Sequence, residues 1–176
     1  FNPPFTARRR IAASEVGSAC EREKCAAEPR WAEASTRFAW RDEVIWGEVH
    51  DGNAHHLGGV AGHAGLFGTV AELNRLAEHL VKGVWRTPYL QPLADDGANR
   101  RSLAAVLATT VDSAAFGVLP GTSIGHAGFT GVSWQYQPES GHHFFLMTNR
   151  THPAIRLADT APLRREFLRL AVGLAA

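Results

Sequence analysis

The residues between Gly125 and Gly131 have the composition of a binding loop. The segment reads Gly-His-Ala-Gly-Phe-Thr-Gly, so three glycines surround one histidine, His126. Glycine allows the backbone to approach another molecule closely, which brings backbone N–H groups within reach of a bound group. A histidine among such N–H groups indicates a site, and the neighbouring elements must hold it in place.

The residues that follow predict a β-hairpin. Three large apolar side chains alternate with polar ones, as in a half-buried strand: Val132, Trp134 and Tyr136. The sequence Pro-Glu-Ser-Gly at 138–141 supplies turn chemistry, and Phe-Phe-Leu-Met at 144–147 is an apolar run of strand length. We therefore take residues 124–149 to be the element around which the chain is organised.

The loop and hairpin together resemble the C-terminal sheet of the serine β-lactamase and penicillin-binding-protein-like hydrolases. The particular match is to the class C-like, esterase-like branch, whose Lys-Thr-Gly box is often His-Thr-Gly. Here the box reads His126-Ala127-Gly128. The resemblance implies an α+β fold of the β-lactamase/transpeptidase-like type, in which an antiparallel sheet is flanked by helices.

Two further segments resemble the same family and occur in the same order along the chain. The closer match covers residues 49–69, which begin Val-His-Asp and end LGGVAGHAGLFGT. A weaker match covers residues 10–15, RIAASE. The matches together touch most of the chain from Phe1 to about Leu174.

The family's other two motifs are missing. Enzymes of this kind use a nucleophilic Ser in Ser-x-x-Lys and a Tyr in Tyr-x-Asn, and only the third box is present here. No serine has a Lys three residues later, and neither Tyr89 nor Tyr136 has an Asn two residues later. We expect residues 1–176 to be a single partial domain, the C-terminal portion of a β-lactamase-related domain whose N-terminal part carries the nucleophile.

The resemblance also implies a role for each box residue. His126 takes the place of the basic residue and faces the cleft of the nucleophile. The backbone N–H of Phe129 is one of two oxyanion-hole donors, and such a donor stabilises a transition state by about 2.7–4 kcal/mol. Ala127 and Gly128 line the substrate, and Ala127 lacks the hydroxyl with which the family's Thr can bind a substrate carboxylate.

The function implied is that of a bacterial serine hydrolase acting on an ester or amide through an acyl-enzyme, without a cofactor. Its substrate would be a small-molecule or cell-wall-like acyl compound, and its partner would be the missing N-terminal part of the same domain. This chain alone is expected to be inactive. The alternative is a non-catalytic ligand-binding or degenerate module of the same fold, and both a periplasmic or secreted and a cytoplasmic location stay open.

A histidine-rich stretch offers a metal site as a further alternative. His50, His55, His56 and His63 lie close to Asp51, and imidazole and carboxylate are ordinary zinc ligands. The spacing argues against this alternative, because no pair forms an HExxH pattern and glycines interrupt any helix that would align the ligands. A tightly turned loop with hydrogen-bonded polar side chains is the favoured interpretation.

Helix signals appear on both sides of the sheet residues. Thr69 and Glu72 predict a capping box for a helix that ends near Gly83; its predicted apolar stripe is Leu73, Leu76, Ala77 and Leu80. A last helix is predicted from Asp159 or Thr160 onward; its predicted apolar face is Leu163, Phe167, Leu170, Ala171 and Leu174. Residues 102–111 have helical propensity, but the resemblance favours a strand there.

Composition sets limits on function. With 18 basic and 17 acidic side chains the net charge is +1, which gives no electrostatic footprint for nucleic acid or an anionic membrane. No apolar run approaches the roughly 18 residues of a membrane span. Cys20 and Cys25 permit a small disulfide loop, a partial metal site or free thiols.

An incomplete sheet should leave apolar surface uncovered. The chain lacks an initiating Met, which suggests a piece of a longer chain. We expect Trp134, Phe144 and Leu146 to lack part of their cover, so that the isolated chain self-associates or packs loosely.

Overall fold

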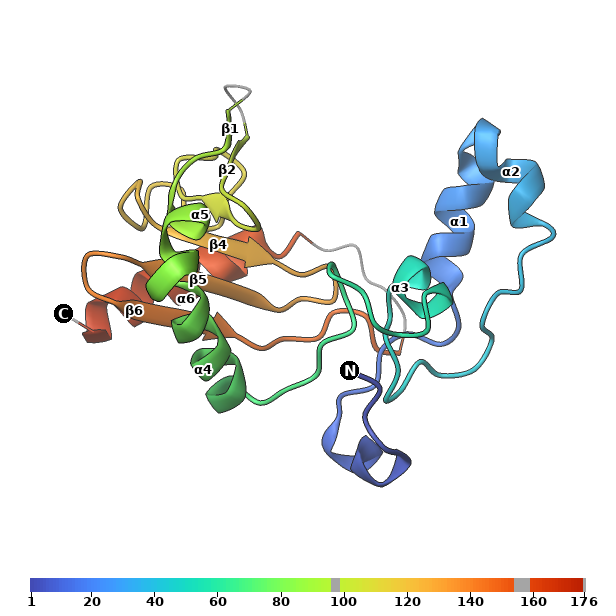
Figure 1. The fold of residues 1–176 in the computed structure, drawn as a ribbon. Coiled ribbons are helices and arrows are strands. Elements are labelled where there is room, and N and C mark those ends of the chain that lie inside the picture. Colours follow the sequence, from blue (N-terminus) through green and yellow to red (C-terminus); the bar gives the residue numbers. More distant parts are fainter. Residues whose placement is uncertain (96–98, 154–158, 176) are drawn as a thin grey trace. The chain divides into compact units, whose positions relative to one another are not determined.

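The chain forms two compact units in a computed structural model that describes residues 1–95, 99–153 and 159–175 (Figure 1). Unit 1 comprises Phe1–Phe67 and Asn149–Leu157, and unit 2 comprises Gly68–Thr148 and Ala158–Ala176. Each unit is described by itself. That they belong to a single partial domain stays a prediction.

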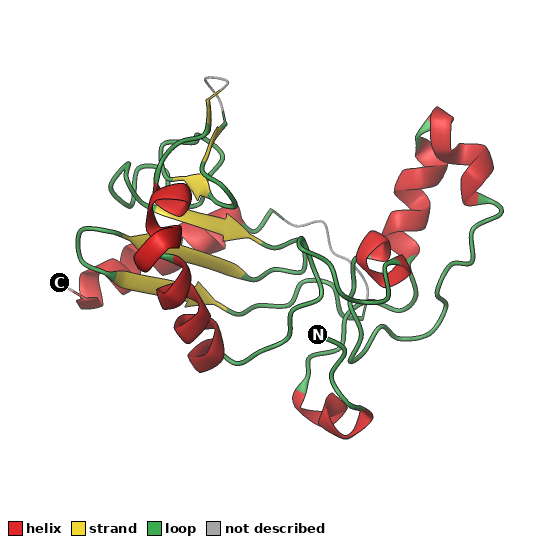
Figure 2. Cartoon of the chain, viewed as in Figure 1, coloured by secondary structure: helices red, strands yellow, loops and turns green. Residues whose placement is uncertain are grey.

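Unit 2 is built on a six-stranded antiparallel sheet whose strands follow one another in sequence order (Figure 2). The strands are β1 Ala94–Asp95, β2 Arg100–Arg101, β3 Val106–Leu107, β4 Ile124–Ala127, β5 Ser133–Gln137 and β6 His142–Leu146. Helices accompany the sheet in the same unit: α4 Val70–Leu80, η2 Gly83–Trp85, α5 Arg86–Leu90 and α6 Ala161–Ala175. This mixture of helix and antiparallel sheet confirms the α+β class.

The predicted hairpin is confirmed as β5 and β6. The two strands are in register from Ser133 opposite Leu146 to Gln137 opposite His142. Gly141 closes the turn with a φ of 73°, a value that glycine adopts without the steric cost other residues meet, and its N–H donates to the carbonyl of Gln137 at 2.9 Å.

The strand predicted over 102–111 is present but short. Only Val106 and Leu107 pair with β4. Turns end the strand on both sides, because the N–H of Ser102 donates to the carbonyl of Ala105 and that of Thr110 to the carbonyl of Leu107. The helical propensity of the segment is overridden by these tertiary and turn contacts.

Each face of the sheet packs against its own helices, as Figure 2 shows. Successive residues of a strand point to opposite faces, so Tyr136 and Gln135 on β5 lie on different sides. One core is formed by Val81, Ala105, Leu107, Ile124 and Tyr136, with Tyr89, Leu90 and Trp134 against it. The other is formed by Ala108, Ala114, Ala115, Leu119, Phe144 and Leu168.

Helix α4 begins as predicted. The side chain of Thr69 accepts from the N–H of Glu72, and the Glu72 carboxylate accepts from the N–H of Thr69, which is the reciprocal capping box. Ala77 is buried, and Leu73 and Leu80 are half-buried. Leu76 is wrongly placed in the apolar stripe, because it is 42% exposed.

Helix α6 starts as predicted, but its buried face is only partly the predicted one. Its first N–H, from Ala161, donates to the Asp159 carboxylate at 2.8 Å. Two residues of the predicted apolar face, Phe167 and Ala171, pack against the core, together with Leu168 and Val172, which were not predicted to do so. The other three are exposed: Leu163 by 53%, Leu170 by 54% and Leu174 by 91%.

The same helix corrects the expectation about uncovered sheet residues. Phe144 is only 7% exposed because it packs with Leu168 of α6. Trp134 and Leu146 are half-buried. The expectation is therefore wrong for Phe144, whereas Trp134 and Leu146 are partly exposed as expected, and further exposed apolar side chains lie on α6.

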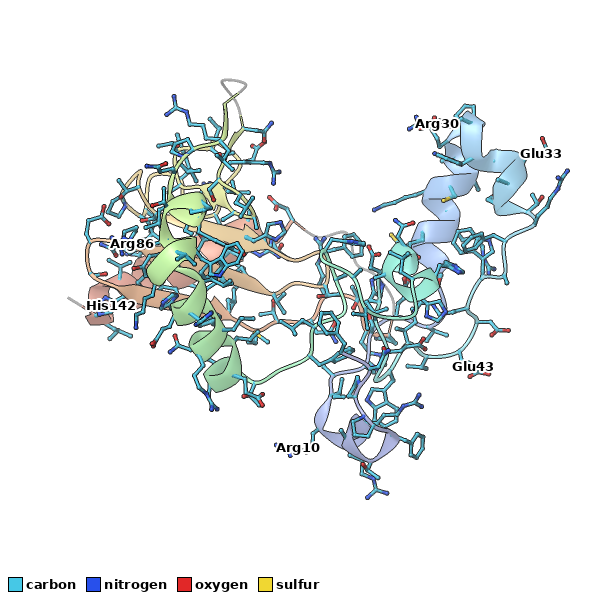
Figure 3. All side chains as sticks on the ribbon, in the orientation of Figure 1. Arg10, Arg30, Glu33, Glu43, Arg86 and His142 are labelled. Atoms are coloured by element: carbon cyan, nitrogen blue, oxygen red, sulfur yellow. The ribbon has the colours of Figure 1, made fainter. Side chains whose placement is uncertain are left out.

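Unit 1 contains short helices and long connections. The helices are η1 Phe5–Arg10, α1 Ala19–Ala27, α2 Pro29–Ser35 and α3 Gly52–His56. Arg30 and Glu33 point outward from α2 (Figure 3). Ile45, Val49 and Ala54 are buried, whereas Trp31 is exposed rather than packed.

Cys20 and Cys25 are both free thiols in α1, so the disulfide alternative is excluded. Burial raises the pKa of the Cys20 thiol, which keeps it protonated and unreactive near neutral pH. Within the described residues, no helix has both the length and the apolar character that crossing a bilayer requires.

Candidate functional site

The box residues lie on β4, at a place where one edge of the strand is open. Along its whole length β4 pairs with β5, but β3 pairs only with its first two residues, Ile124 and Gly125. Among the residues that the structure describes, no strand pairs with the outer edge of His126 and Ala127, and both are exposed. An open edge presents backbone N–H and C=O groups with which an extended ligand can pair.

The side chains of His126 and Ala127 point to different faces of the sheet. His126 is opposite Trp134, which is opposite Phe145, so these three side chains share one face. Ala127 is opposite Ser133 and lies on the other face. Gly125 allows β4 to approach β5 closely, because a Cβ there would overlap the side chain of Gln135.

The turn from Gly128 to Val132 follows the box and is closed by its own backbone. The N–H of Gly128 donates to the carbonyl of Val132 at 2.8 Å, and that of Gly131 to the carbonyl of Gly128 at 3.2 Å. The hydroxyl of Thr148 donates to the carbonyl of Gly131 at 2.8 Å. Phe129, which sequence analysis proposes as an oxyanion donor, lies in this turn, and that role stays a prediction.

Arg164 is the site residue that sequence analysis missed. Its Nη2 donates to the carbonyl of Gly128 at 2.9 Å and to that of Val132 at 3.3 Å. Arg164 is not among the residues of the apolar face that the sequence predicts for the last helix. Its position four residues before Leu168 is the signal that could have found it, because residues four apart share a helix face.

The electrostatics of the site favour a neutral imidazole. Partial burial lowers the pKa of His126 below its ordinary value, and the positive charges of Arg101 and Arg164 lower it further. A neutral imidazole can accept a hydrogen bond at one nitrogen and donate at the other. His126 therefore differs from the family's Lys, which carries a charge and only donates.

The histidine-rich stretch forms separate pairs with carboxylates, and all of them lie in unit 1. Three pairs are present: His50 with Glu15 at 2.9 Å, His55 with Glu48 at 3.2 Å and His63 with Asp51 at 3.1 Å. In the described part of the chain, no three His, Cys, Asp or Glu side chains converge as ligands to one metal ion would. The geometry gives the metal alternative no support.

These pairs hold a turned loop, as the favoured interpretation predicts. Asp51 caps α3 by accepting from the N–H of Ala54 at 2.8 Å. Partial burial opposes ionisation of Asp51, but hydrogen bonds from Ala54 and His63 hold its pKa below the ordinary value. Arg41 donates to the carbonyls of Val49 and His50, at 2.7 and 2.5 Å. The polar groups of this loop are therefore used in holding the chain.

A cavity of about 620 Å³ lies elsewhere in unit 2. It is lined by Leu90, Pro92, Arg100, Leu107, Thr109, Gly121, Thr122, Pro138 and Glu139. None of the box residues lines it. The box and this cavity are therefore separate candidates for ligand binding.

The structure brings together the four sequence-predicted site residues in one unit, on β4 and the turn after it. Comparison of the chain with protein-family models, with curated proteins and with solved structures gave no match in any of the three. The geometry of this site is therefore the basis for assigning a function.

Proposed function

We propose that this chain is the C-terminal part of a β-lactamase-related serine hydrolase domain that acts on an ester or amide. The observation that carries the proposal is the open edge of β4 at His126 and Ala127, followed directly by the closed turn from Gly128 to Val132. An edge on which an extended acyl chain can pair, next to a turn that contains the Phe129 N–H, supports the proposal, because acyl transfer is accelerated by hydrogen-bond donors directed at the developing oxyanion.

In the proposed reaction, some of the catalytic groups belong to this chain and the others to the part that would precede it. A serine hydroxyl from the preceding part attacks the carbonyl carbon, its proton passes to a base, and the alcohol or amine leaves with a proton. Water then hydrolyses the acyl-enzyme. In this chain, the N–H of Phe129 donates to the developing oxyanion, and neutral His126 exchanges hydrogen bonds with substrate or with the nucleophile's partners.

Ala127 narrows the substrate class. The family's Thr offers a hydroxyl to a substrate carboxylate, and a methyl group cannot. We therefore expect esters or amides without a carboxylate next to the reacting bond to be better substrates than penicillins or cephalosporins.

The test begins with the reading frame upstream of Phe1. If the proposal is right, we expect Ser-x-x-Lys and then Tyr-x-Asn in that upstream sequence. We also expect the longer protein to hydrolyse a nitrophenyl ester and residues 1–176 alone not to hydrolyse it. In the longer protein, Ser→Ala at the motif should abolish turnover, and His126→Ala should lower kcat/KM. Stoichiometric acylation of residues 1–176 alone, or an upstream frame without either motif, contradicts the proposal.

A second candidate, a non-catalytic binding module of the same fold, is favoured by the cavity that lies apart from the box. This candidate expects a start codon close to Phe1 and binding of an acyl ligand that survives His126→Ala. Loss of binding in a variant of the cavity that leaves the core intact, such as Thr122→Arg at an exposed position of its lining, would support it against the hydrolase.

A further inference from the structure

We propose that Arg164 of α6 is a positioning residue, which fixes the direction of the Phe129 N–H by holding the Gly128 carbonyl. The inference rests on the proposed function for its purpose, but its geometry is independent of any turnover. Arg164 donates from one nitrogen to the carbonyls of Gly128 and Val132, at 2.9 and 3.3 Å.

The peptide plane links the two groups. The carbonyl of Gly128 and the N–H of Phe129 belong to one peptide unit, which is planar and trans, so they point in opposite directions. Because Arg164 holds this carbonyl towards α6, the Phe129 N–H must be directed away from α6. A cation on the carbonyl oxygen also polarises the amide, and hydrogen bonds in such a chain strengthen one another.

The guanidinium holds both ends of the turn. Gly128 and Val132 are its first and last residues, and they are already joined by the Gly128 N–H to Val132 carbonyl bond. With Arg164 on both carbonyls, the turn cannot rotate about one end alone. Both hydrogen bonds come from the two hydrogens of Nη2, whose directions are fixed by the planar guanidinium, whereas the Lys ammonium is a compact, strongly hydrated charge with rotatable donors on a flexible stem.

Helix α6 gives Arg164 a fixed base. The helix is capped at its start by Asp159 and is anchored by buried Leu168, which packs with Phe144 of β6. Arg164 itself is half-buried, so water competes less for its hydrogen bonds than at the surface.

Arg164 also acts on the imidazole of the box. Partial burial of the ring lowers the pKa of His126 most, and the positive charges of Arg101 and of Arg164 lower it further. The Arg164 side chain therefore fixes the direction of the Phe129 N–H and also favours the neutral form of the His126 imidazole. A merely structural arginine would be expected to affect stability but not these two properties together.

The test compares Arg164→Met and Arg164→Lys with a matched control, Arg165→Met. Arg165 is the next residue on the same helix and its side chain is exposed. The Arg165→Met substitution therefore removes the same charge as Arg164→Met without removing the hydrogen bonds to the turn. The first readout is hydrogen exchange, by mass spectrometry, of a peptide covering residues 125–134. The second is the pH midpoint at which diethylpyrocarbonate modifies His126, with exposed His142 at the outer end of β6 (Figure 3) as internal reference.

In Arg164→Met we expect roughly tenfold or more faster exchange of the turn amides, since a hydrogen bond to a charged group is lost. We also expect the His126 midpoint to rise, because one of the positive charges that lower the pKa of His126 is removed. Arg164→Lys should keep the midpoint low but restore only part of the exchange protection. Arg165→Met should change neither readout.

The inference is overturned if Arg164→Met matches Arg165→Met in both readouts. If Arg164→Met fails to fold, as judged by circular dichroism, Arg164→Lys decides, and full protection of the turn in that variant also overturns it. Neither readout depends on turnover, so failure of the hydrolase assay would leave the inference about Arg164 intact. Conversely, unchanged hydrogen exchange in the turn would leave the result of the hydrolase assay intact.

Discussion

At the scale of single residues, the site depends on two kinds of position. His126 and Gly128 are recognisable from sequence because a histidine among glycines is unusual and forms a pattern. Arg164 has no such pattern, because its partners are backbone carbonyls 36 and 32 residues earlier in the chain. The only local signal is its spacing of four residues from Leu168, and the structure is what identifies Leu168 as buried.

Gly131 is the residue whose replacement should disturb the turn most. Its φ is 122°, a conformation that L residues rarely adopt, and an added Cβ would lie 2.9 Å from the carbonyl oxygen of Thr148. Gly131→Ala should therefore lower the free energy of unfolding by about 1–3 kcal/mol.

The comparison for this prediction is Gly173→Ala. Gly173 lies in α6 with open space around it, so alanine there should raise stability by about 0.5–1 kcal/mol through helix propensity. Urea unfolding followed by tryptophan fluorescence measures both. Equal stability of Gly131→Ala and the parent chain would show that the turn is less constrained than its geometry implies.

At the scale of elements, the features predicted correctly from the sequence are those determined by residues close together in the chain. The α4 capping box and the β5–β6 turn arise from residues within a few positions of one another, and both are confirmed. The buried face of α6 was predicted correctly for Phe167 and Ala171 and wrongly for the three leucines, because two stripes compete. The stripe of Leu163, Leu170 and Leu174 is as periodic as the one around Leu168, and only the tertiary contact with Phe144 decides between them.

The contact between Trp134 of β5 and His143 of β6 should depend on pH. The indole N–H of Trp134 donates to Nδ1 of His143 at 3.1 Å, and the His143 ring stacks on Tyr136 at 4.5 Å. Burial lowers the pKa of His143; Glu78 on α4 acts in the opposite direction and Lys82 adds to the lowering. Protonation of Nδ1 would remove the acceptor that Trp134 uses.

The sign of the dependence follows from linkage. Because the folded pKa lies below the unfolded value, the unfolded chain binds more protons between the two. The stabilisation is therefore complete above the unfolded pKa, about 6.5, and is lost as pH falls towards the folded pKa. His126 contributes in the same direction. Urea unfolding at pH 7, 6 and 5 should show falling stability.

The variant His143→Phe should make this pH dependence shallower, and His142→Phe, at the exposed neighbouring position, is the matched control. A pH profile of His143→Phe that matches the parent chain would assign the dependence to other groups.

At the scale of the whole molecule, each unit has a core, but unit 2 keeps uncovered apolar surface on α6. Leu163, Leu170 and Leu174 are seven and four residues apart, so they share one side of the helix. β6 is the last strand in the sheet order, and within the described ranges its outer edge has no strand partner. An apolar helix side and an open strand edge in one unit are what the proposed missing N-terminal part would cover.

This surface gives the prediction of self-association a specific location. If α6 drives association, the double variant Leu170→Gln with Leu174→Gln should remain monomeric at concentrations where the parent chain forms larger species, because the largest exposed part of the stripe becomes polar. The buried residue Leu168 is untouched, so the fold should be kept. Light scattering with size-exclusion chromatography measures the change.

The control is Val84→Gln, which removes another exposed apolar side chain of unit 2, 85% exposed, away from α6. It should leave association as it is in the parent chain. If both variants associate like the parent, the open edge of β6 is the remaining candidate, and Phe145→Lys on that strand should then reduce association, since charged side chains protect strand edges. A parent chain that is monomeric from the start would contradict the prediction, and it would also weaken the proposal that a further part of the domain covers α6.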